Sequence, residues 1–278
     1  MKVRVEKQIG AGTLSIETGE FAKQAAGSCL VQYGETVVLT AVATGAARAG
    51  IDFFPLTCDY RERTAAAGKF PGGFLKREGR PTMKETLTAR LMDRPIRPLF
   101  PEWFHDEVQI QSNVLASDRQ TDGDILAMNG AAAALAISGL PFEGPLASIR
   151  LGRVNGEFIP FPTQDDLEES DLDLIVSGSR DAVLMIEGFA RELPEDVMAD
   201  AIQQCHNYIR EICDLQAELV QKVGVQPHQY EVPPSDGVYE RLREKFYADL
   251  KTAKAIIGKQ DRSEASKAVA EGPRSIDS

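Results

Sequence analysis

The amino-terminal half of the chain carries short apolar and alternating runs that predict β-strands. Residues 36–44, TVVLTAVAT, are β-branched or apolar throughout, which is typical of a strand covered on both faces. Residues 108–115, VQIQSNVL, alternate between apolar and polar side chains and predict a half-buried strand. The Tyr33-Gly34 turn predicts a hairpin. Further strands are expected at 14–18, 27–32 and 53–60.

Helical patterns close each of two groups of strands. Residues 125–138 are rich in alanine, and such small side chains allow a helix to pack closely on a sheet. Residues 194–223 place apolar side chains at steps of three and four, which predicts a long amphipathic helix. Between these helices, strands are expected at 147–154, 157–160, 172–177 and 182–187. Two groups of strands, each followed by a helix, predict an α+β fold in a layered α/β arrangement.

The boundaries between these patterns predict the domain organisation. We expect a core domain at 1–225, with an amino-terminal lobe at about 11–141 and a carboxyl-terminal lobe at about 144–224. The proline-containing residues 226–236 predict a linker. Residues 237–278 begin a helical domain that we expect to be truncated, because a lone helix with a polar tail buries little apolar surface.

Composition adds an expected location. The 278 residues are 43 % hydrophobic and carry a formal net charge of -11. No run of about 18 or more apolar residues occurs, and the amino terminus, MKVRVEKQIGAG, lacks the apolar core of a signal peptide. We therefore expect a cytoplasmic protein that does not associate with a membrane. The acidic run at 165–173 is expected to form a solvated loop between strands.

One segment reverses the acidic character of the chain. Residues 69–100 contain eight lysines and arginines but only three acidic residues. Phe70 and Phe74 lie among these cations, and the glycines and prolines at 68–81 predict a shaped loop. Good helix formers at 84–92 predict a short basic helix behind the loop. The cations are Lys69, Lys76, Arg77, Arg80, Lys84, Arg90, Arg94 and Arg97.

The residues of this segment allow two interpretations. In one, the cations neutralise phosphates and an exposed ring stacks on a base, which contributes roughly 1–3 kcal/mol per base. In the other, Phe70 and Phe74 are buried under the loop and the arginines pair with the three acids, Glu78, Glu85 and Asp93. Because three acids do not balance eight cations, we favour binding of single-stranded nucleic acid.

Four long motifs carry a family resemblance. They are FPLTCDYRERTAAAGKFPGGFLKREGRP at 54–81, ETLTARLMDRPIRPLFPEWF at 85–104, DILAMNGAAAALAISGLPFEGP at 124–145 and PTQDDLEESDLDLIVSGSRDAVLMIEG at 162–188. Together they resemble the bacterial polynucleotide phosphorylase (polyribonucleotide nucleotidyltransferase) family over most of 1–257. The resemblance implies the first of two RNase PH-like core domains, with mixed sheets packed with helices, followed by the beginning of an all-α domain.

The resemblance implies part of an enzyme that forms a homotrimeric ring around a central channel. Single-stranded RNA, including mRNA, would be shortened from its 3′ end by phosphorolysis, in a reversible reaction. Inorganic phosphate would be the co-substrate and nucleoside diphosphates the products. The family's Mg²⁺ site belongs to the second core domain, so we expect neither a catalytic residue nor a bound metal in this chain. Other proteins of an RNA-degradation assembly are expected partners.

The resemblance also implies RNA-binding residues. The aromatic and basic channel loop of the family falls on residues 74–77, where Leu75 stands in place of a second ring and Lys76 in place of an arginine. The downstream arginines match positions along the path of RNA and anions. The RNA-binding residues expected from the resemblance are Phe74, Lys76, Arg77, Arg80, Arg94 and Arg97.

The turn before the alanine-rich helix departs from the family's catalytic pattern. In the second core domain this turn carries phosphate-binding serines, whereas here Asp122 and Asp124 would repel a phosphate dianion. We expect Asp124 to cap the helix that starts near Ile125. The chain is therefore expected to supply RNA-channel binding and the trimer scaffold, and to be inactive alone. The alternatives are a non-catalytic RNA-binding ring module and a self-sufficient phosphorolytic nuclease, against which the missing serines argue.

Overall fold

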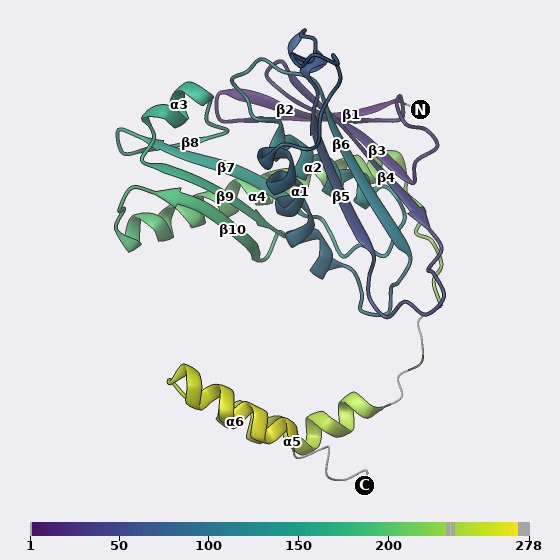
Figure 1. The fold of residues 1–278 in the computed structure, drawn as a ribbon, viewed down its shortest axis with the longest axis vertical. Helices are drawn as coiled ribbons and strands as arrows, with labels where there is room; N and C mark the ends of the chain where they lie inside the picture. Colours follow the sequence, from purple (N-terminus) through teal and green to yellow (C-terminus); the bar gives the residue numbers. More distant parts are fainter. Residues whose placement is uncertain (1, 232–233, 235–236, 272–278) are drawn as a thin grey trace. The chain divides into compact units, whose positions relative to one another are not determined.

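The computed structural model describes residues 2–231, 234 and 237–271. The chain divides into two compact units, Met1–Gln229 and Tyr230–Ser278. The first unit contains two β-sheets and the helices that cover them, and the second contains two helices (Figure 1). The predicted α+β fold of mixed sheets packed with helices is confirmed.

The first sheet consists of six strands, β1 (Val3–Ile9), β2 (Gly12–Thr18), β3 (Gly27–Tyr33), β4 (Thr36–Gly45), β5 (Leu56–Glu62) and β6 (Glu107–Ala116). They lie in the order β1-β2-β3-β4-β6-β5 (Figure 1). Neighbouring strands are antiparallel except β5 and β6, which run parallel. The predicted hairpin is confirmed, because Tyr33 pairs with Thr36 across β3 and β4.

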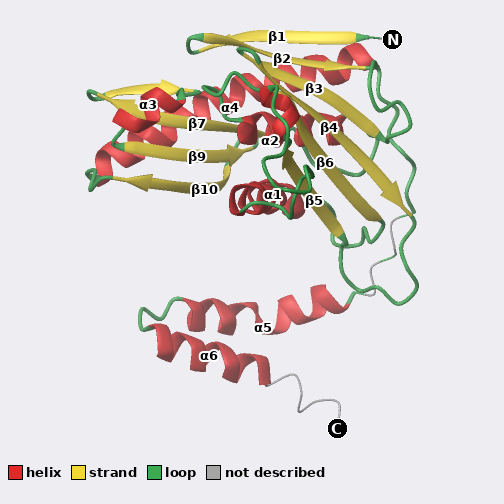
Figure 2. Cartoon of the chain, turned by 45° about the horizontal axis from the view of Figure 1, so that its top comes forward, coloured by secondary structure: helices red, strands yellow, loops and turns green. Residues whose placement is uncertain are grey.

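The second sheet consists of four strands, β7 (Ala147–Val154), β8 (Glu157–Pro160), β9 (Leu172–Gly178) and β10 (Val183–Ala190). They lie in the order β10-β9-β7-β8 and all neighbours are antiparallel (Figure 2). The side chains of Leu151, Leu174 and Val176 are buried in this sheet's core. The strands predicted by the sequence patterns are confirmed in both sheets, with small differences at their ends.

Helix α2 (Gly123–Ala136) forms the centre of the core, because it packs against β3, β4 and β6 of the first sheet and against β7 of the second. All of its residues except the last are buried. Small residues permit this close approach. A Cβ on Gly27 would lie 2.1 Å from the Ala134 carbonyl oxygen, and a Cβ on Gly130 would lie 2.7 Å from Thr40 Oγ1. The predicted alanine-rich helix against a sheet is therefore confirmed.

Helix α4 (Glu195–Val223) packs across β1, β7 and β9. The apolar side chains on its inner face are spaced three and four residues apart and are buried, which confirms the predicted amphipathic helix. Gly224 ends the helix in the left-handed conformation, with φ at 70°. The buried apolar side chains of α4 are Ala201, Cys205, Ile209, Ile212, Cys213, Leu215 and Leu219.

Helix α1 (Met83–Ile96) packs against β5 and begins with a capping box. Thr82 Oγ1 accepts the Glu85 N–H at 3.1 Å, and the Glu85 carboxylate accepts the Thr82 N–H at 2.6 Å. The helix continues past its expected end at residue 92 and through Pro95, because the apolar residues of its last turn are buried. A short 3-10 helix, η2 (Arg97–Leu99), follows it.

Strand β1 and helix α3 (Gln164–Glu169) are not predicted by the sequence patterns. Strand β1 alternates as VRVEKQI but contains few apolar residues, and its pairing with β2 and contact with α4 stabilise it. Helix α3 lies in the acidic run, so the expected solvated loop is wrong over these residues. Its capping box explains the difference, because Thr163 Oγ1 accepts the Asp166 N–H at 3.1 Å.

The second unit contains α5 (Val238–Lys254) and α6 (Lys259–Glu271), which contact each other. Helix α5 confirms the helix expected near this position. Helix α6 is not predicted, because its polar sequence has no apolar stripe. Residues 232, 233, 235 and 236 of the expected linker and residues 272–278 lie outside the described residues. Within the described part of the chain, every helix is too short or too polar to cross a membrane.

Replacing Gly27 by alanine is expected to lower the free energy of unfolding by about 1–3 kcal/mol or more, because the new Cβ meets the Ala134 carbonyl oxygen. Gly72→Ala is the matched control, since no atom of the described residues lies within 4 Å of a Cβ there. Urea denaturation followed by circular dichroism measures the difference. A Gly27→Ala variant as stable as the wild type would contradict the close approach of β3 and α2.

Candidate nucleic-acid interface

The loop at 68–81 presents its aromatic side chains to solvent. Phe74 is 100 % exposed and Phe70 is 89 % exposed, so the interpretation in which both rings are buried is wrong. The Lys76 N–H donates to the Gly73 carbonyl oxygen at 3.0 Å, which closes a turn with Phe74 at its tip. Lys76 itself adopts a left-handed φ of 49°. The Phe74 ring is therefore free to stack on a base.

Three cations of this loop have no acidic partner. Among the described residues, Lys76, Arg77 and Arg80 form neither an ion pair nor a side-chain hydrogen bond. Glu78 and Glu85 accept hydrogen bonds from backbone N–H groups instead of pairing with arginines. The ion-pairing interpretation is therefore wrong for these two acids, and the three cations are available to phosphate.

The other two expected arginines lie behind the loop and have internal partners. Arg94 on α1 pairs with Glu187 on β10 at 2.6 Å, and both side chains are half exposed. Arg97 pairs with Asp93 at 2.6 Å, as the second interpretation expects, and also donates to two carbonyl oxygens at and just before the start of β5. Four of the six expected residues thus share one exposed loop. For all six, RNA binding stays a prediction.

A cavity of about 530 Å³ lies between β5 and α1. Arg90, which belongs to the basic cluster but not to the expected RNA-binding residues, lines it together with Arg94 and Arg97. Arg90 and Arg94 are four residues apart on α1, and Arg97 follows at the C-cap of this helix. The spacing of four and three residues places the three arginines on one side, and it is the signal in the sequence that locates Arg90. Asp59 and Asp93 also line the cavity, so its charge is mixed.

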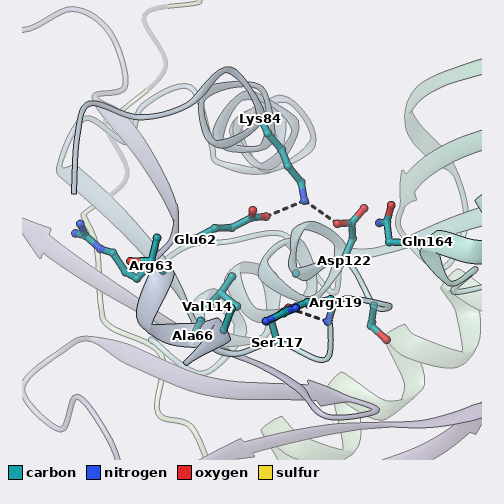
Figure 3. A pocket seen from close by; sticks show the side chains of 13 residues that line it. Glu62, Arg63, Ala66, Lys84, Val114, Ser117, Arg119, Asp122 and Gln164 are labelled. Carbon is teal, nitrogen blue, oxygen red and sulfur yellow. Dashed lines mark hydrogen bonds and ion pairs between the residues drawn. The ribbon is translucent and has the colours of Figure 1, made fainter. Parts of the chain in front are cut away.

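A second cavity of about 530 Å³ lies where β5, β6, α1 and α2 meet (Figure 3). Lys84 reaches into it from α1 and pairs with Glu62 at 3.0 Å and with Asp122 at 2.7 Å. Burial acts to lower the pKa of Lys84, but the nearby carboxylates outweigh it and raise that pKa above its ordinary value. Arg63 and Arg119 also line this cavity.

Three aspartates surround the guanidinium of Arg150, which extends from β7 toward the start of α2. Arg150 lies 2.5 Å from Asp122, 2.6 Å from Asp173 and 3.4 Å from Asp124. Burial and the charge of Asp122 raise the pKa of Asp124 to about 6. Burial also acts to raise the pKa of Asp122, but the charges of Lys84 and Arg150 outweigh it and lower that pKa.

The cap of α2 differs from the expected one. Asp122, and not Asp124, is the N-cap residue, and its side chain makes no capping hydrogen bond. Asp124 lies in the first turn, where its Oδ1 accepts the Ile125 N–H at 2.6 Å. The physical reason is electrostatic, because Lys84 and Arg150 bind the Asp122 carboxylate and hold it away from the N–H groups of the helix.

This turn fits neither a phosphate nor a magnesium ion. Its carboxylates already pair with Lys84 and Arg150, and they repel an anion where hydroxyl groups would bind one. The aspartates converge on a guanidinium and leave no open coordination position for Mg²⁺. Among the residues that the structure describes, no cluster of three or more His, Cys, Asp or Glu side chains is suited to a metal ion.

Comparison with known proteins gives the class. Residues 12–141 match domain 1 of the 3′ exoribonuclease family, and residues 144–207 match domain 2. The crystal structure of rice Rrp46 and an Archaeoglobus fulgidus exosome with RNA bound to the active site share the fold, with TM-scores of 0.62 and 0.58 at 16 % identity. Each match covers 77 % of this chain, and 96 % and 87 % of those chains. The chain belongs to the 3′ exoribonuclease family and has an RNase PH-like fold.

Within this class the chain matches one kind of enzyme. It is 63 % identical over 268 residues to the polyribonucleotide nucleotidyltransferase of Rhodopirellula baltica and 48 % identical over 267 residues to that of Natranaerobius thermophilus. The matches cover 96 % and 95 % of this chain. The chain spans 36 % and 37 % of the length of those relatives, a little more than a third. The resemblance to this family of enzymes is confirmed.

Asp124→Asn is expected to change how stability depends on pH. Because folding raises the pKa of Asp124 to about 6, the stability that its protonated form contributes is lost as the pH rises through that value. Asparagine does not titrate, so the variant should gain about 1–3 kcal/mol relative to the wild type between about pH 4 and pH 7. Urea denaturation at several pH values measures this gain, and parallel stability curves would contradict it.

Proposed function

We propose that this chain is the RNA-binding and trimer-forming part of a polyribonucleotide nucleotidyltransferase. Such an enzyme is a phosphate-dependent 3′-to-5′ exoribonuclease that converts single-stranded RNA, including mRNA, to nucleoside diphosphates, in a reversible reaction. One observation carries the proposal. The fully exposed ring of Phe74 lies on a loop whose cations Lys76, Arg77 and Arg80 have no acidic partner among the described residues.

The chemistry of this loop suits single-stranded RNA. Each cation neutralises a phosphate and releases counterions, and stacking on an aromatic ring contributes about 1–3 kcal/mol per base for any base. The chain carries a net charge of -11, which repels RNA from the acidic surfaces and favours contact at the basic loop. Binding without sequence preference is what an enzyme needs when it shortens an RNA strand one nucleotide at a time.

Catalysis belongs to a second core domain in this proposal. The turn before α2 pairs its aspartates with Lys84 and Arg150, so inorganic phosphate and Mg²⁺ would bind elsewhere in the whole protein. The core domain at 1–225 would then contribute the ring and its RNA channel, and the linker at 226–236 would lead to the helical domain at 237–278. Three copies would form the ring in the cytoplasm and join other RNA-degrading proteins there.

A non-catalytic RNA-binding ring module is the alternative, and the same turn favours it, because its carboxylates suit neither phosphate nor a metal ion. The 63 % identity to an enzyme of this class favours the first proposal. Phosphorolysis by the full-length protein separates the two. Release of nucleoside diphosphates supports the enzyme, and tight RNA binding without release supports the module.

Arg77→Ala is expected to weaken RNA binding roughly three- to tenfold. The slope of log K against the logarithm of the salt concentration should decrease in magnitude by about one, which corresponds to the loss of one phosphate contact. Phe74→Ala should weaken binding roughly five- to a hundredfold through lost stacking. Leu75→Ala is the matched control, because Leu75 is exposed on the same turn but has neither ring nor charge. Fluorescence anisotropy with a labelled oligonucleotide and the full-length protein measures affinity. Equal small losses for Arg77→Ala and Leu75→Ala would count against the proposal.

The 278-residue chain alone is expected to release little or no nucleoside diphosphate from RNA and inorganic phosphate, because its α2 turn does not hold phosphate. Chromatography of the products from an end-labelled oligonucleotide measures the release. The full-length protein under the same conditions is the positive control. Robust release by the 278 residues would overturn the assignment of catalysis to a second core domain.

A further inference from the structure

The loop at 68–81, for which RNA binding is proposed, is attached to the fold at both of its ends. At the amino-terminal end, the 3-10 helix η1 (Thr64–Ala67) is fixed to the end of β6, because the Ser117 N–H donates to one of its carbonyl oxygens at 3.1 Å. At the carboxyl-terminal end, the capping box of Thr82 and Glu85 begins α1. The Glu85 carboxylate also accepts the Glu62 N–H at 2.9 Å, which joins this end to β5.

Between these ends the loop makes almost no contact with the fold. Nearly all side chains at 70–80 are exposed, and a Cβ on any of the three glycines there would meet no described atom within 4 Å. Among the described residues, one side chain of this stretch forms hydrogen bonds to the rest of the protein. It is Glu78, whose Oε1 accepts the Thr64 N–H at 3.0 Å and the Thr64 hydroxyl at 2.8 Å.

We infer that Glu78 is a positioning residue for RNA binding, because its carboxylate closes the loop onto Thr64 and so determines where Phe74 and Arg77 project. The inference rests on the proposed function of this loop. Closure between residues 64 and 78 removes conformations that the free loop would otherwise sample. A loop that is already ordered loses less conformational entropy when RNA binds, and its affinity is correspondingly higher.

The positioning role and the negative charge of Glu78 have opposite effects on RNA affinity. A carboxylate next to Arg77 repels the phosphates of a bound strand, so electrostatics alone predicts that its removal strengthens RNA binding. A positioning role predicts that removal of the side chain weakens binding. Glutamine separates the two effects, because its carbonyl oxygen has two lone pairs and can accept both hydrogen bonds from Thr64 without a negative charge.

The test compares Glu78→Ala with Glu78→Gln in the full-length protein, by fluorescence anisotropy with a labelled single-stranded RNA oligonucleotide. We expect Glu78→Ala to bind roughly three- to tenfold more weakly than the wild type, and Glu78→Gln to bind at least as tightly as the wild type. Thr64→Val removes only the hydroxyl donor, so it should cost about twofold and be less than additive with Glu78→Ala. Equal affinities of Glu78→Ala and Glu78→Gln would overturn the inference.

Limited trypsin digestion reports on the loop without RNA. Trypsin cleaves after Lys76 and Arg77, and we expect Glu78→Ala to be cut several-fold faster than Glu78→Gln. Equal cleavage rates for these two uncharged variants would overturn the inference. If Arg77→Ala leaves RNA affinity unchanged, the proposed function itself fails, and the positioning role fails with it. If Arg77→Ala weakens binding and Glu78→Ala does not, only the positioning role fails.

Discussion

The close packing of α2 between the two sheets is the constraint on which the rest of the structure depends. Glycines at the contact allow backbone to approach backbone, and the helix is buried from its first residue. Its N-cap residue, Asp122, and its first-turn residue, Asp124, therefore carry their carboxylates toward the interior. Buried carboxylates require compensating charge, which Lys84 from α1 and Arg150 from β7 supply. The position of one helix thus draws α1, α2 and the second sheet into one electrostatic network.

The cations of this acidic chain are of two kinds, those that belong to this network and those on the exposed loop at 68–81. Lys84 and Arg150 neutralise internal carboxylates, and their loss would leave buried charges without partners. The cations of the exposed loop have no such task. Arg94 lies between these cases, because a half-exposed ion pair such as Arg94–Glu187 contributes only about 0–1 kcal/mol. Arg97 is held more firmly, by a carboxylate and by two backbone carbonyl oxygens.

The parts of the fold that could be predicted from the sequence are β6 and α4, which have a periodic apolar face, and α2, whose run of small and apolar residues is buried almost all round. Strand β1 and helices α3 and α6 are polar, and pairing, capping or contact with another element stabilises them. Charge clustering located the exposed loop. The partners of Glu78 and Asp122 could not be read from the sequence, because Thr64, Lys84 and Arg150 are 14, 38 and 28 residues away from them and meet them only through tertiary packing.

The parallel pairing of β5 and β6 determines how freely the composition and length of the loop at 68–81 can change. Parallel neighbours begin at the same end of a sheet, so the chain between them must travel back along its length. The segment at 63–106 forms this crossover, with α1 as the return path and the loop as an outer excursion. Because the excursion lies outside the ladder of strand hydrogen bonds, changes in its composition or length leave the register of the sheet intact. Exposed side chains on this excursion, such as Leu75 and Lys76, can therefore be exchanged without disturbing the scaffold beneath them.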